Sequence, residues 1–329
     1  MTADDADGAR SEPARAPLAQ ARLAEVRLAR AKVNYALHVT GRRADGYHLL
    51  ESLVAFPEFG DRLALAPPAS PPDDGALGLT VGGRFAADLG TNADTGDNLV
   101  LRALRALDAR LGASATGYRL HLEKNLPVAS GIGGGSADAA AALLLGLELR
   151  TGRQADRHDL DMLAALALEL GADVPMCLAS RPALVSGIGE RIAPLPRFPA
   201  HAVVLVNPGI AIPTPAVFSR LAGRDNPPLP PTGYTGFAGV DHLVDWLGET
   251  RNDLQEAAIS VAPEIGDVLA MLRRQDGVRL ARMSGSGATC FALLETLGAA
   301  RALAKDIGAR HPHWWAAAAP VEGVAPPGG

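Results

Sequence analysis

A run of glycines in the middle of the chain constrains its structure more than any other segment. Residues 127–142 read PVASGIGGGSADAAAA, and four of the five residues from Gly131 to Gly135 are glycine. Glycine adopts positive φ angles without strain, and its N–H groups approach a ligand with no Cβ in the way. An alanine-rich helix is predicted to begin at about Ser136, with Asp138 in its first turn, and its N-terminus would add unpaired N–H donors. We therefore expect a phosphate-binding loop.

The loop matches neither of the two commonest phosphate-binding patterns. A Walker loop requires a lysine after the glycines, and none is present. A Rossmann fingerprint opens directly from a strand, whereas residues 124–130 separate this loop from the predicted strand at 118–123. A flexible glycine turn beside a packed helix remains an alternative at this point.

Composition limits the class of protein. A length of 329 residues suits about two domains, and contents of 48% hydrophobic and 20% charged residues are typical of a globular protein. Aromatic residues make up 4%, so the core must consist mainly of Leu, Val and Ala. The net charge of −5 gives no basic surface for nucleic acid. Cys177 and Cys290 lie in apolar settings, which indicates buried free thiols in a reducing compartment.

The sequence shows no sign of export or membrane insertion. Four acidic residues and no apolar stretch occur in the first twenty residues, and the longest apolar run, 139–147, is too short to span a bilayer. We expect a cytoplasmic protein that binds neither nucleic acid nor a membrane.

Hydrophobic periodicity and turn residues predict an α+β fold, because strands and helices mix without regular βαβ alternation. Strands are expected at 25–30, 118–123, 202–206, 278–283 and 289–295, with a hairpin over 31–56 that turns at Gly41–Gly46. Helices are expected at 98–111 (capped by Asp97), 136–149, 159–170, 253–259, 264–274 and 299–308. Residues 66–75 and 222–240 are rich in proline or glycine and predict loops.

Lysine is scarce in this chain. Only Lys32, Lys124 and Lys305 occur, so 28 of the 31 basic residues are arginine. Lysine is a compact point charge whose pKa shifts on burial, properties that arginine lacks. The bias therefore draws attention to Lys32 and Lys124.

Three segments, 31–53, 126–143 and 283–293, together resemble the GHMP kinase superfamily. Lys-x-Asn followed by TGRRADGYH, together with residues 170–178, 207–218 and 251–255, is similar to the branch whose acceptor carries a cytidine diphosphate group. Three departures from that branch are visible: NDLQ stands where NDLE is commoner, NPG stands where HPG is commoner, and the phosphate loop reads PVASGIGGG where the branch more often has a Met and further small residues after the Pro. None of these departures falls on the expected chemistry.

The resemblance implies a two-domain architecture with the active site in the cleft between the domains. The N-terminal domain, like domain 2 of ribosomal protein S5, would span 21–185 and bind ATP. A ferredoxin-like α/β sandwich over 186–318 would bind the substrate. Residues 1–20 and 319–329 are expected to be disordered tails.

The resemblance also implies ATP and Mg²⁺ as cofactors and a role for each residue that matches the family's motifs. Asp173 would accept the proton of the acceptor hydroxyl, and Lys32 would stabilise the developing charge beside it. Lys32 is expected on a strand, where an ammonium held in water is the alternative. The loop that wraps the ATP phosphates would comprise Pro127, Val128, Ala129, Ser130, Gly131, Ile132, Gly133, Gly134, Gly135, Ser136 and Ala137. Ser136 would bind phosphate or Mg²⁺, and a plain helix N-cap is the alternative.

The acceptor would be held by a second group of residues. Tyr47 and His48 would bind the cytosine by stacking and hydrogen bonding, with Phe218 on the opposite face of the base. Asn34 and Thr214 would be polar contacts. For Phe218, ordinary core packing is an equally good explanation. The turn 284–287 is expected to support the phosphate loop.

Other functions remain open from the sequence alone. A kinase of the homoserine or mevalonate type would share the fold, and a non-catalytic nucleotide-binding sensor could reuse it. No protein metal site is assigned, because His311 and His313 have no Cys or carboxylate partners in the pattern. The chain is expected to be a monomer or a homodimer.

Overall fold

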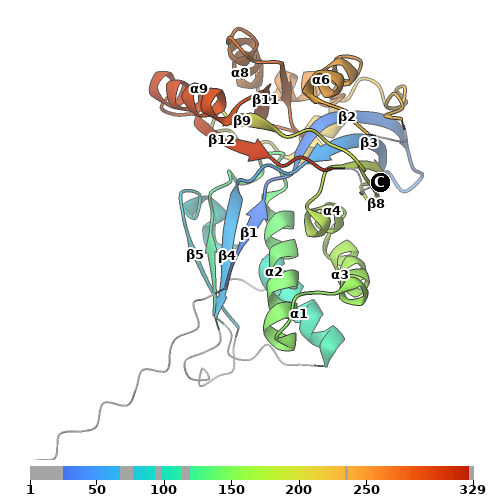
Figure 1. The fold of residues 1–329 in the computed structure, drawn as a ribbon, viewed down its shortest axis with the longest axis vertical. Coiled ribbons are helices and arrows are strands. Elements are labelled where there is room, and N and C mark those ends of the chain that lie inside the picture. The colour runs from blue at the N-terminus through green and yellow to red at the C-terminus, as the bar shows by residue number, and fades with distance from the viewer. Residues whose placement is uncertain (1–24, 67–76, 93–97, 113–118, 234–235, 326–329) are drawn as a thin grey trace, which may run out of the picture.

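The computed structural model describes residues 25–66, 77–92, 98–112, 119–233 and 236–325 (Figure 1). These ranges contain three four-stranded sheets and nine α-helices. The mixture of elements confirms the α+β prediction. The predicted N-terminal tail lies outside the described residues, as does the loop at 66–75 apart from Ala66. No described helix is both long and apolar enough to cross a membrane.

The first sheet has the strand order β1-β4-β6-β5, and α2 packs against its strands β1 and β4, with the other helices of the N-terminal half packed around α2 (Figure 1). Its strands are β1 (Glu25–Arg30), β4 (Gly60–Ala66), β5 (Gly78–Gly82) and β6 (Arg119–Glu123). The helices are α1 (Leu99–Leu111), α2 (Gly134–Thr151), α3 (Arg157–Leu170) and α4 (Val174–Ala179), and a 3-10 helix (Ala87–Asn92) precedes α1. Alternation along β6 buries Leu120 and Leu122, so this strand has one core face. The core is built mainly from Leu and Ala, as the scarcity of aromatic residues predicts.

The second sheet, in the order β2-β3-β7-β8, links the two halves of the molecule. Its strands are β2 (Val33–Arg42), β3 (His48–Ala55), β7 (Ala183–Gly187) and β8 (Arg191–Pro194). The first seven residues of β2 are all buried, because both of its faces are covered. A domain boundary at residue 185 would fall inside β7, whose pairing continues to β8. The division into 21–185 and 186–318 otherwise remains a prediction.

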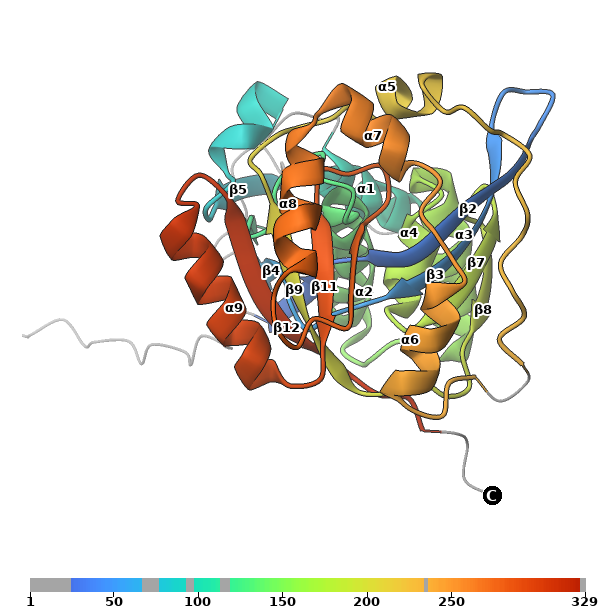
Figure 2. The same cartoon turned by 90° about the horizontal axis from the view of Figure 1, so that it is seen from above.

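The third sheet, in the order β10-β11-β9-β12, forms the C-terminal half. Its strands are β9 (His201–Asn207), β10 (Leu280–Met283), β11 (Cys290–Leu294) and β12 (Trp315–Val321). The helices of this half are α5 (Thr214–Ser219), α6 (Val240–Gly248), α7 (Gln255–Val261), α8 (Glu264–Arg273) and α9 (Leu297–Arg310). Figure 2 shows α8 and α9 lying over one face of the sheet. Val203 and Leu205 of β9 point to the opposite face, toward the second sheet.

Several predicted boundaries were wrong for local reasons. The side chain that caps α1 is Asn98, whose Oδ1 accepts a hydrogen bond from the N–H of Val100, whereas Asp97 lies outside the described residues. Helix α2 begins at Gly134 and not at Ser136, because Gly133 (φ 67°) makes the turn into it. Ser136 is therefore not the N-cap, and Asp138 lies beyond the first turn.

The predicted C-terminal tail from residue 319 is also wrong. Strand β12 continues to Val321, which pairs with His201 of β9. Its sequence, WAAAAPV, does not alternate between apolar and polar residues, so the sequence gives no strand signal. Buried and half-buried residues nevertheless alternate along the strand in the structure. Pro320 is tolerated because β12 is an edge strand. The elements that were not predicted are helices α4, α5 and α6, the 3-10 helix and strands β4, β5, β7, β8 and β12.

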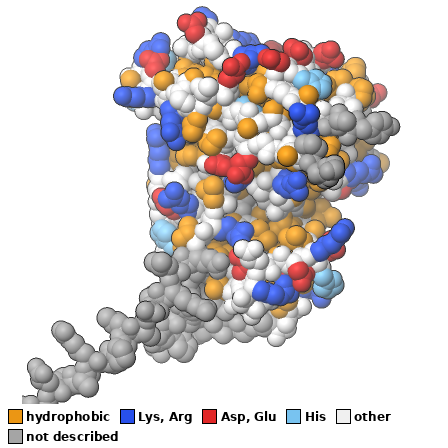
Figure 3. All heavy atoms as spheres, viewed as in Figure 1, with side chains coloured by type: hydrophobic (Ala, Val, Ile, Leu, Met, Phe, Trp, Pro, Cys, Tyr) orange, Lys and Arg blue, Asp and Glu red, His pale blue; other side chains and the backbone are white. Residues whose placement is uncertain are grey.

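The described surface carries charges of both signs. On the face drawn in Figure 3, Lys and Arg side chains are interspersed with Asp and Glu side chains. Neither sign dominates that face, in keeping with the small net charge of −5.

His201 makes the fold sensitive to acid. Its Nδ1 lies 2.9 Å from the carbonyl oxygen of Pro199 and its Nε2 lies 2.7 Å from the Tyr35 hydroxyl, an arrangement that suits a neutral ring. Burial lowers the pKa of His201 to about 4, partly opposed by the Pro199 hydrogen bond. The unfolded chain, with a histidine pKa near 6.5, binds the proton first as pH falls. The stabilisation is complete above about pH 6.5 and is lost progressively toward pH 4, by about 3 kcal/mol.

Urea unfolding at several pH values tests this prediction. The free energy of unfolding of the wild type should fall between pH 6.5 and 4 more steeply than that of His201→Gln, which has no titrating ring. Parallel curves for the two proteins would exclude His201 as the source.

Candidate functional site

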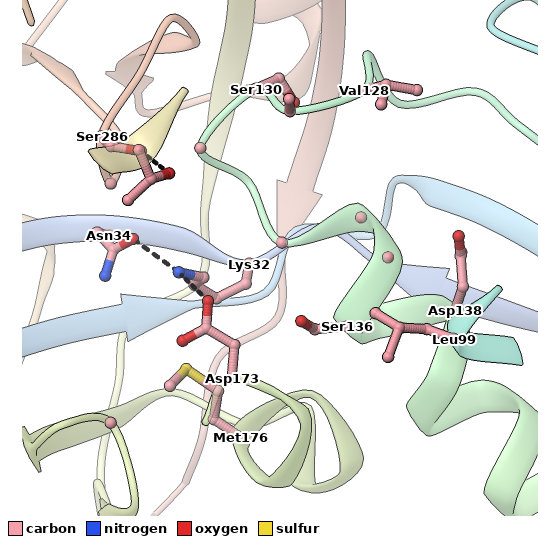
Figure 4. Close-up of a pocket in the computed structure, with 18 of the residues that line it drawn as sticks. Lys32, Asn34, Leu99, Val128, Ser130, Ser136, Asp138, Asp173, Met176 and Ser286 are labelled. Atoms are coloured by element: carbon pink, nitrogen blue, oxygen red, sulfur yellow. Dashed lines mark hydrogen bonds and ion pairs between the residues drawn. The ribbon is translucent and has the colours of Figure 1, made fainter. Parts of the chain in front are cut away.

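A cavity of about 660 Å³ lies between the two halves of the molecule (Figure 4). The phosphate loop predicted from the glycine run forms one wall, Lys32 lies beside the end of this loop, and Asp173 faces Lys32 across the cavity. Residues of α5 and of the turn 284–287 close the C-terminal side. The structure thus brings together segments that are far apart in the sequence.

The phosphate loop has an unusual backbone. Ala129, Gly131 and Gly133 all have positive φ angles, of 50°, 77° and 67°. Such a backbone directs successive N–H groups to one side and favours anion binding. Helix α2 begins directly after Gly133, so its first-turn N–H groups also face the loop.

Nine of the eleven predicted loop residues line the cavity. The nine are Pro127, Val128, Ala129, Ser130, Gly131, Gly133, Gly134, Gly135 and Ser136. Ile132 and Ala137 do not line it, because their side chains are buried in the two cores that flank the loop. These two residues anchor the loop instead of exposing atoms to a ligand.

The turn 284–287 supports the loop from the C-terminal half, as expected. The Ser284 hydroxyl donates a hydrogen bond to the carbonyl oxygen of Gly131 (3.1 Å), and the N–H of Thr289 donates to that of Ser130 (3.1 Å). A Cβ on Gly131 would lie 2.5 Å from the carbonyl oxygen of Ser284. Only glycine fits at this position.

Lys32 and Asp173 form an ion pair in the cavity. Lys32 Nζ lies 3.0 Å from Asp173 Oδ2 and donates to Asn34 Oδ1 at 3.1 Å. Asn34 is held by its own donation to the Ser52 hydroxyl (2.7 Å). Lys32 lies between β1 and β2 and not on a strand, and its backbone N–H donates to the carbonyl oxygen of Ile132. Its side chain is 8% exposed, which contradicts the alternative of an ammonium held in water.

The ion pair leaves Asp173 available to a ligand. Asp173 precedes α4, yet its carboxylate makes no capping hydrogen bond to that helix. The side chain is 40% exposed, and it lines the cavity opposite the phosphate loop. A carboxylate in this position can accept a proton from a bound hydroxyl.

A second buried lysine was missed as a site residue. Lys124 Nζ contacts Asp61 Oδ2 and donates to Asp138 Oδ2 at 2.7 Å. Asp61 Oδ1 accepts the backbone N–H groups of Asn125 (2.6 Å) and Leu126 (2.9 Å), just before the loop. The scarcity of lysine was the only sequence signal that pointed to Lys124. The cluster of Lys124, Asp61 and Asp138 joins three segments that are far apart in the sequence, so no local pattern predicts it.

The charges in this cluster shift one another's pKa values. Burial alone would lower the pKa of Lys124, but Asp138 and Asp61 outweigh it and the pKa is raised. Burial raises the pKa of Asp138, although Lys124 acts in the opposite sense. Two carboxylates therefore share one cation beneath the phosphate loop.

The predicted base-binding residues do not form an open slot. The rings of His48 and Phe218 stack on each other, with centroids 4.6 Å apart and planes at 22°. Tyr47 is 62% exposed. Thr214 and Phe218 line the cavity, and the Thr214 hydroxyl lies 2.9 Å from that of Ser286, but Tyr47 and His48 are not part of its lining.

Phe218 lies at the boundary between the C-terminal core and the cavity. It packs partly against the C-terminal core and also contributes to the wall of the cavity. Burial lowers the pKa of His48, and the nearby Arg42 and Arg224 lower it further. A planar base could enter between the two rings only if they separated.

Comparisons with known proteins agree with this geometry. The family model described as the GHMP kinases N terminal domain matches residues 98–181, and that described as GHMP kinases C terminal matches residues 238–313. A 4-diphosphocytidyl-2-C-methyl-D-erythritol kinase from Cereibacter sphaeroides is 52% identical over 295 residues, covering 89% of this chain and 98% of that protein.

Solved structures show the same relationship. The crystal structure of a 4-(cytidine 5'-diphospho)-2C-methyl-D-erythritol kinase is 34% identical, with a TM-score of 0.70 and coverage of 90% of this chain and 99% of that one. A homoserine kinase from Cytophaga hutchinsonii, 17% identical, has a TM-score of 0.59 over 91% of this chain and 96% of its own. The second likeness concerns the fold alone.

The fold, the two-domain architecture and the cavity define a GHMP kinase, as the resemblance predicted. An enzyme of this class is an ATP-dependent kinase. Within the class, the chain belongs to the family of 4-diphosphocytidyl-2-C-methyl-D-erythritol kinases.

Proposed function

We propose that the protein transfers the γ-phosphoryl group of ATP to the 2-hydroxyl of 4-diphosphocytidyl-2-C-methyl-D-erythritol, a step in non-mevalonate isoprenoid biosynthesis. The observation that carries the proposal is the Lys32–Asp173 ion pair, 3.0 Å long, facing the phosphate loop in a chain 52% identical to a kinase of that name. The two free, buried thiols suit a reducing compartment, and we propose the cytoplasm.

In the proposed mechanism Asp173 acts as the base. As the acceptor oxygen attacks the γ-phosphorus, its proton passes to the Asp173 carboxylate, a new P–O bond forms, and the bond to the β-phosphate oxygen breaks to release ADP. The Lys32 ammonium, 3.0 Å from Asp173 Oδ2, stabilises negative charge at the transferring group. Asn34 holds the ammonium in place.

The phosphate loop binds the triphosphate through backbone N–H groups and the N-terminus of α2. Mg²⁺ favours oxygen ligands and neutralises phosphate charge when it is bound with ATP. The Ser136 hydroxyl, in the first turn of α2 and on the cavity wall, is an oxygen donor of the required kind. Ser136 would therefore bind either Mg²⁺ or a phosphate oxygen.

The acceptor's cytosine would separate the His48–Phe218 stack and use the faces of Tyr47 and Phe218. Stacking on an aromatic ring contributes about 1–3 kcal/mol per base. His48 Nε2, which is buried without a hydrogen-bond partner among the described residues, would bond to the edge of the base. Thr214 and Asn34 would contact the rest of the acceptor.

A panel of acceptors tests the proposal. Purified protein with ATP and Mg²⁺ is expected to add one phosphate, seen by mass spectrometry, to the cytidyl-diphospho-methylerythritol, and to leave homoserine and mevalonate unmodified. Turnover of homoserine or mevalonate alone would assign the protein to a small-alcohol type. ATP binding with no turnover of any acceptor would indicate a nucleotide sensor.

A further inference from the structure

Asp138 has an unsatisfied oxygen in the wall of the cavity. Its side chain is 4% exposed, and Oδ2 accepts a hydrogen bond from Lys124 Nζ. Oδ1 is buried with no hydrogen-bond partner among the described residues. A buried acceptor without a donor is costly, so native structures rarely leave one without a function.

The position of Asp138 identifies the part of a nucleotide that reaches it. Figure 4 shows Asp138 and Leu99 on the side of α2 that faces away from Lys32 and Asp173. If the γ-phosphate faces the Lys32–Asp173 pair, as the proposed function requires, the nucleoside must extend along the opposite wall. Leu99 lies beside Asp138 on that side, and the apolar side chains of Leu89 and Leu122 also line the cavity.

The other polar side chains of this wall are already engaged. Asn98 Oδ1 accepts the N–H of Val100 at the start of α1, and Lys124 is bound by two carboxylates. Lys124 supplies one positive charge against two carboxylates, so the cluster disfavours an anion and accepts a hydrogen-bond donor. A hydroxyl group of the nucleotide is a donor of this kind.

Distance along the helix favours the sugar over the base. Asp138 lies one turn beyond Gly134, about 6 Å along the axis of α2, from the N-terminus that would bind the phosphates. The ribose hydroxyls are a few bonds from the α-phosphate, whereas the 6-amino group is on the far edge of the adenine. We propose that Asp138 Oδ1 accepts a hydrogen bond from a ribose hydroxyl of ATP and thereby selects ribonucleotides. The proposal rests on the proposed function only for the orientation of the nucleotide.

Binding measurements without any acceptor test this inference separately from turnover. The dissociation constants of ADP, 2′-deoxy-ADP, 3′-deoxy-ADP and inosine diphosphate are measured by calorimetry for wild type, D138A and D138N. Wild type is expected to bind one deoxy analogue about tenfold more weakly than ADP, because a hydrogen bond to a charged group is lost. D138A should bind ADP about tenfold more weakly and discriminate against that analogue less than twofold.

Two variants distinguish a direct contact between Asp138 and the nucleotide from a general effect of removing a buried carboxylate. D138N keeps an acceptor oxygen and should retain most of the discrimination. E148A removes another buried carboxylate of α2, which pairs with Arg27 outside the cavity, and should discriminate as wild type does. D138A is expected to fold because Lys124 keeps Asp61 as its partner.

The outcomes decide the assignment. Equal binding of all analogues by wild type, or unchanged discrimination in D138A, would overturn the role of Asp138. If D138A loses its discrimination against inosine diphosphate but still discriminates against both deoxy analogues, Asp138 contacts the 6-amino group of the base. That result would overturn the ribose assignment. A failure to phosphorylate any acceptor would count against the proposed function and leave these binding results valid.

Discussion

Replacement of Asp173 by asparagine is expected to lower kcat by about 10²- to 10⁴-fold while the affinity for ATP changes little. Asparagine has a similar shape but cannot accept a proton from the acceptor hydroxyl. The side chain is partly exposed and makes no helix cap, so the substitution should not unfold the protein. Steady-state kinetics with the cytidyl-diphospho acceptor gives kcat, and calorimetry gives the affinity for ATP.

A matched control is available at the start of α3. Asp156 caps that helix, its side chain is 58% exposed, and asparagine is as good an N-cap as aspartate. Asp156→Asn should therefore keep full activity. Full activity in Asp173→Asn would remove the base role, and an equal loss in both variants would indicate a general effect on folding.

Replacement of Lys32 by methionine is expected to lower kcat/KM by about 10²- to 10³-fold. Methionine fills a similar volume but removes the charge that contacts Asp173 and the donor that Asn34 accepts. Because Asp173 is 40% exposed, water can solvate its carboxylate in the variant and the fold should persist. Arginine should restore little activity, since its larger planar group does not fit beside Gly133.

Lys305→Met provides the control, because Lys305 is exposed on α9 and distant from the cavity. The double variant Lys32→Met/Asp173→Asn should be little slower than Asp173→Asn alone, since the two residues act as a unit. Additive losses would mean that the two side chains serve independent steps.

Much of the fold could be predicted where the signals are local in sequence. The glycine run predicted the phosphate loop, and helix α3 followed from its spacing and from Gly171 at its end. Both of these depend on residues close together in the chain. The meeting of Lys32 and Asp173 was predicted only from the resemblance to GHMP kinases, because no local pattern connects two residues so far apart in the sequence.

Features that depend on tertiary contacts were missed. Strand β12 exists because β9 offers it a free edge, and its alanines carry little signal of their own. The cluster of Lys124, Asp61 and Asp138 joins three segments, and no spacing rule connects them. Likewise, the stacking of Phe218 on His48 depends on where α5 packs, which no local pattern specified.

The support of the phosphate loop by the turn 284–287 has a consequence for synthesis. The hydrogen bond between Ser284 and Gly131 joins residues 153 positions apart, and the supporting residue comes late in the chain. Domains generally fold in order during translation, N-terminal part first. The N-terminal half can therefore collapse early with its glycine loop unsupported, and the loop reaches its final shape only once the ribosome has released residue 289. Nucleotide binding is therefore expected only after residues 284–289 have folded against the loop.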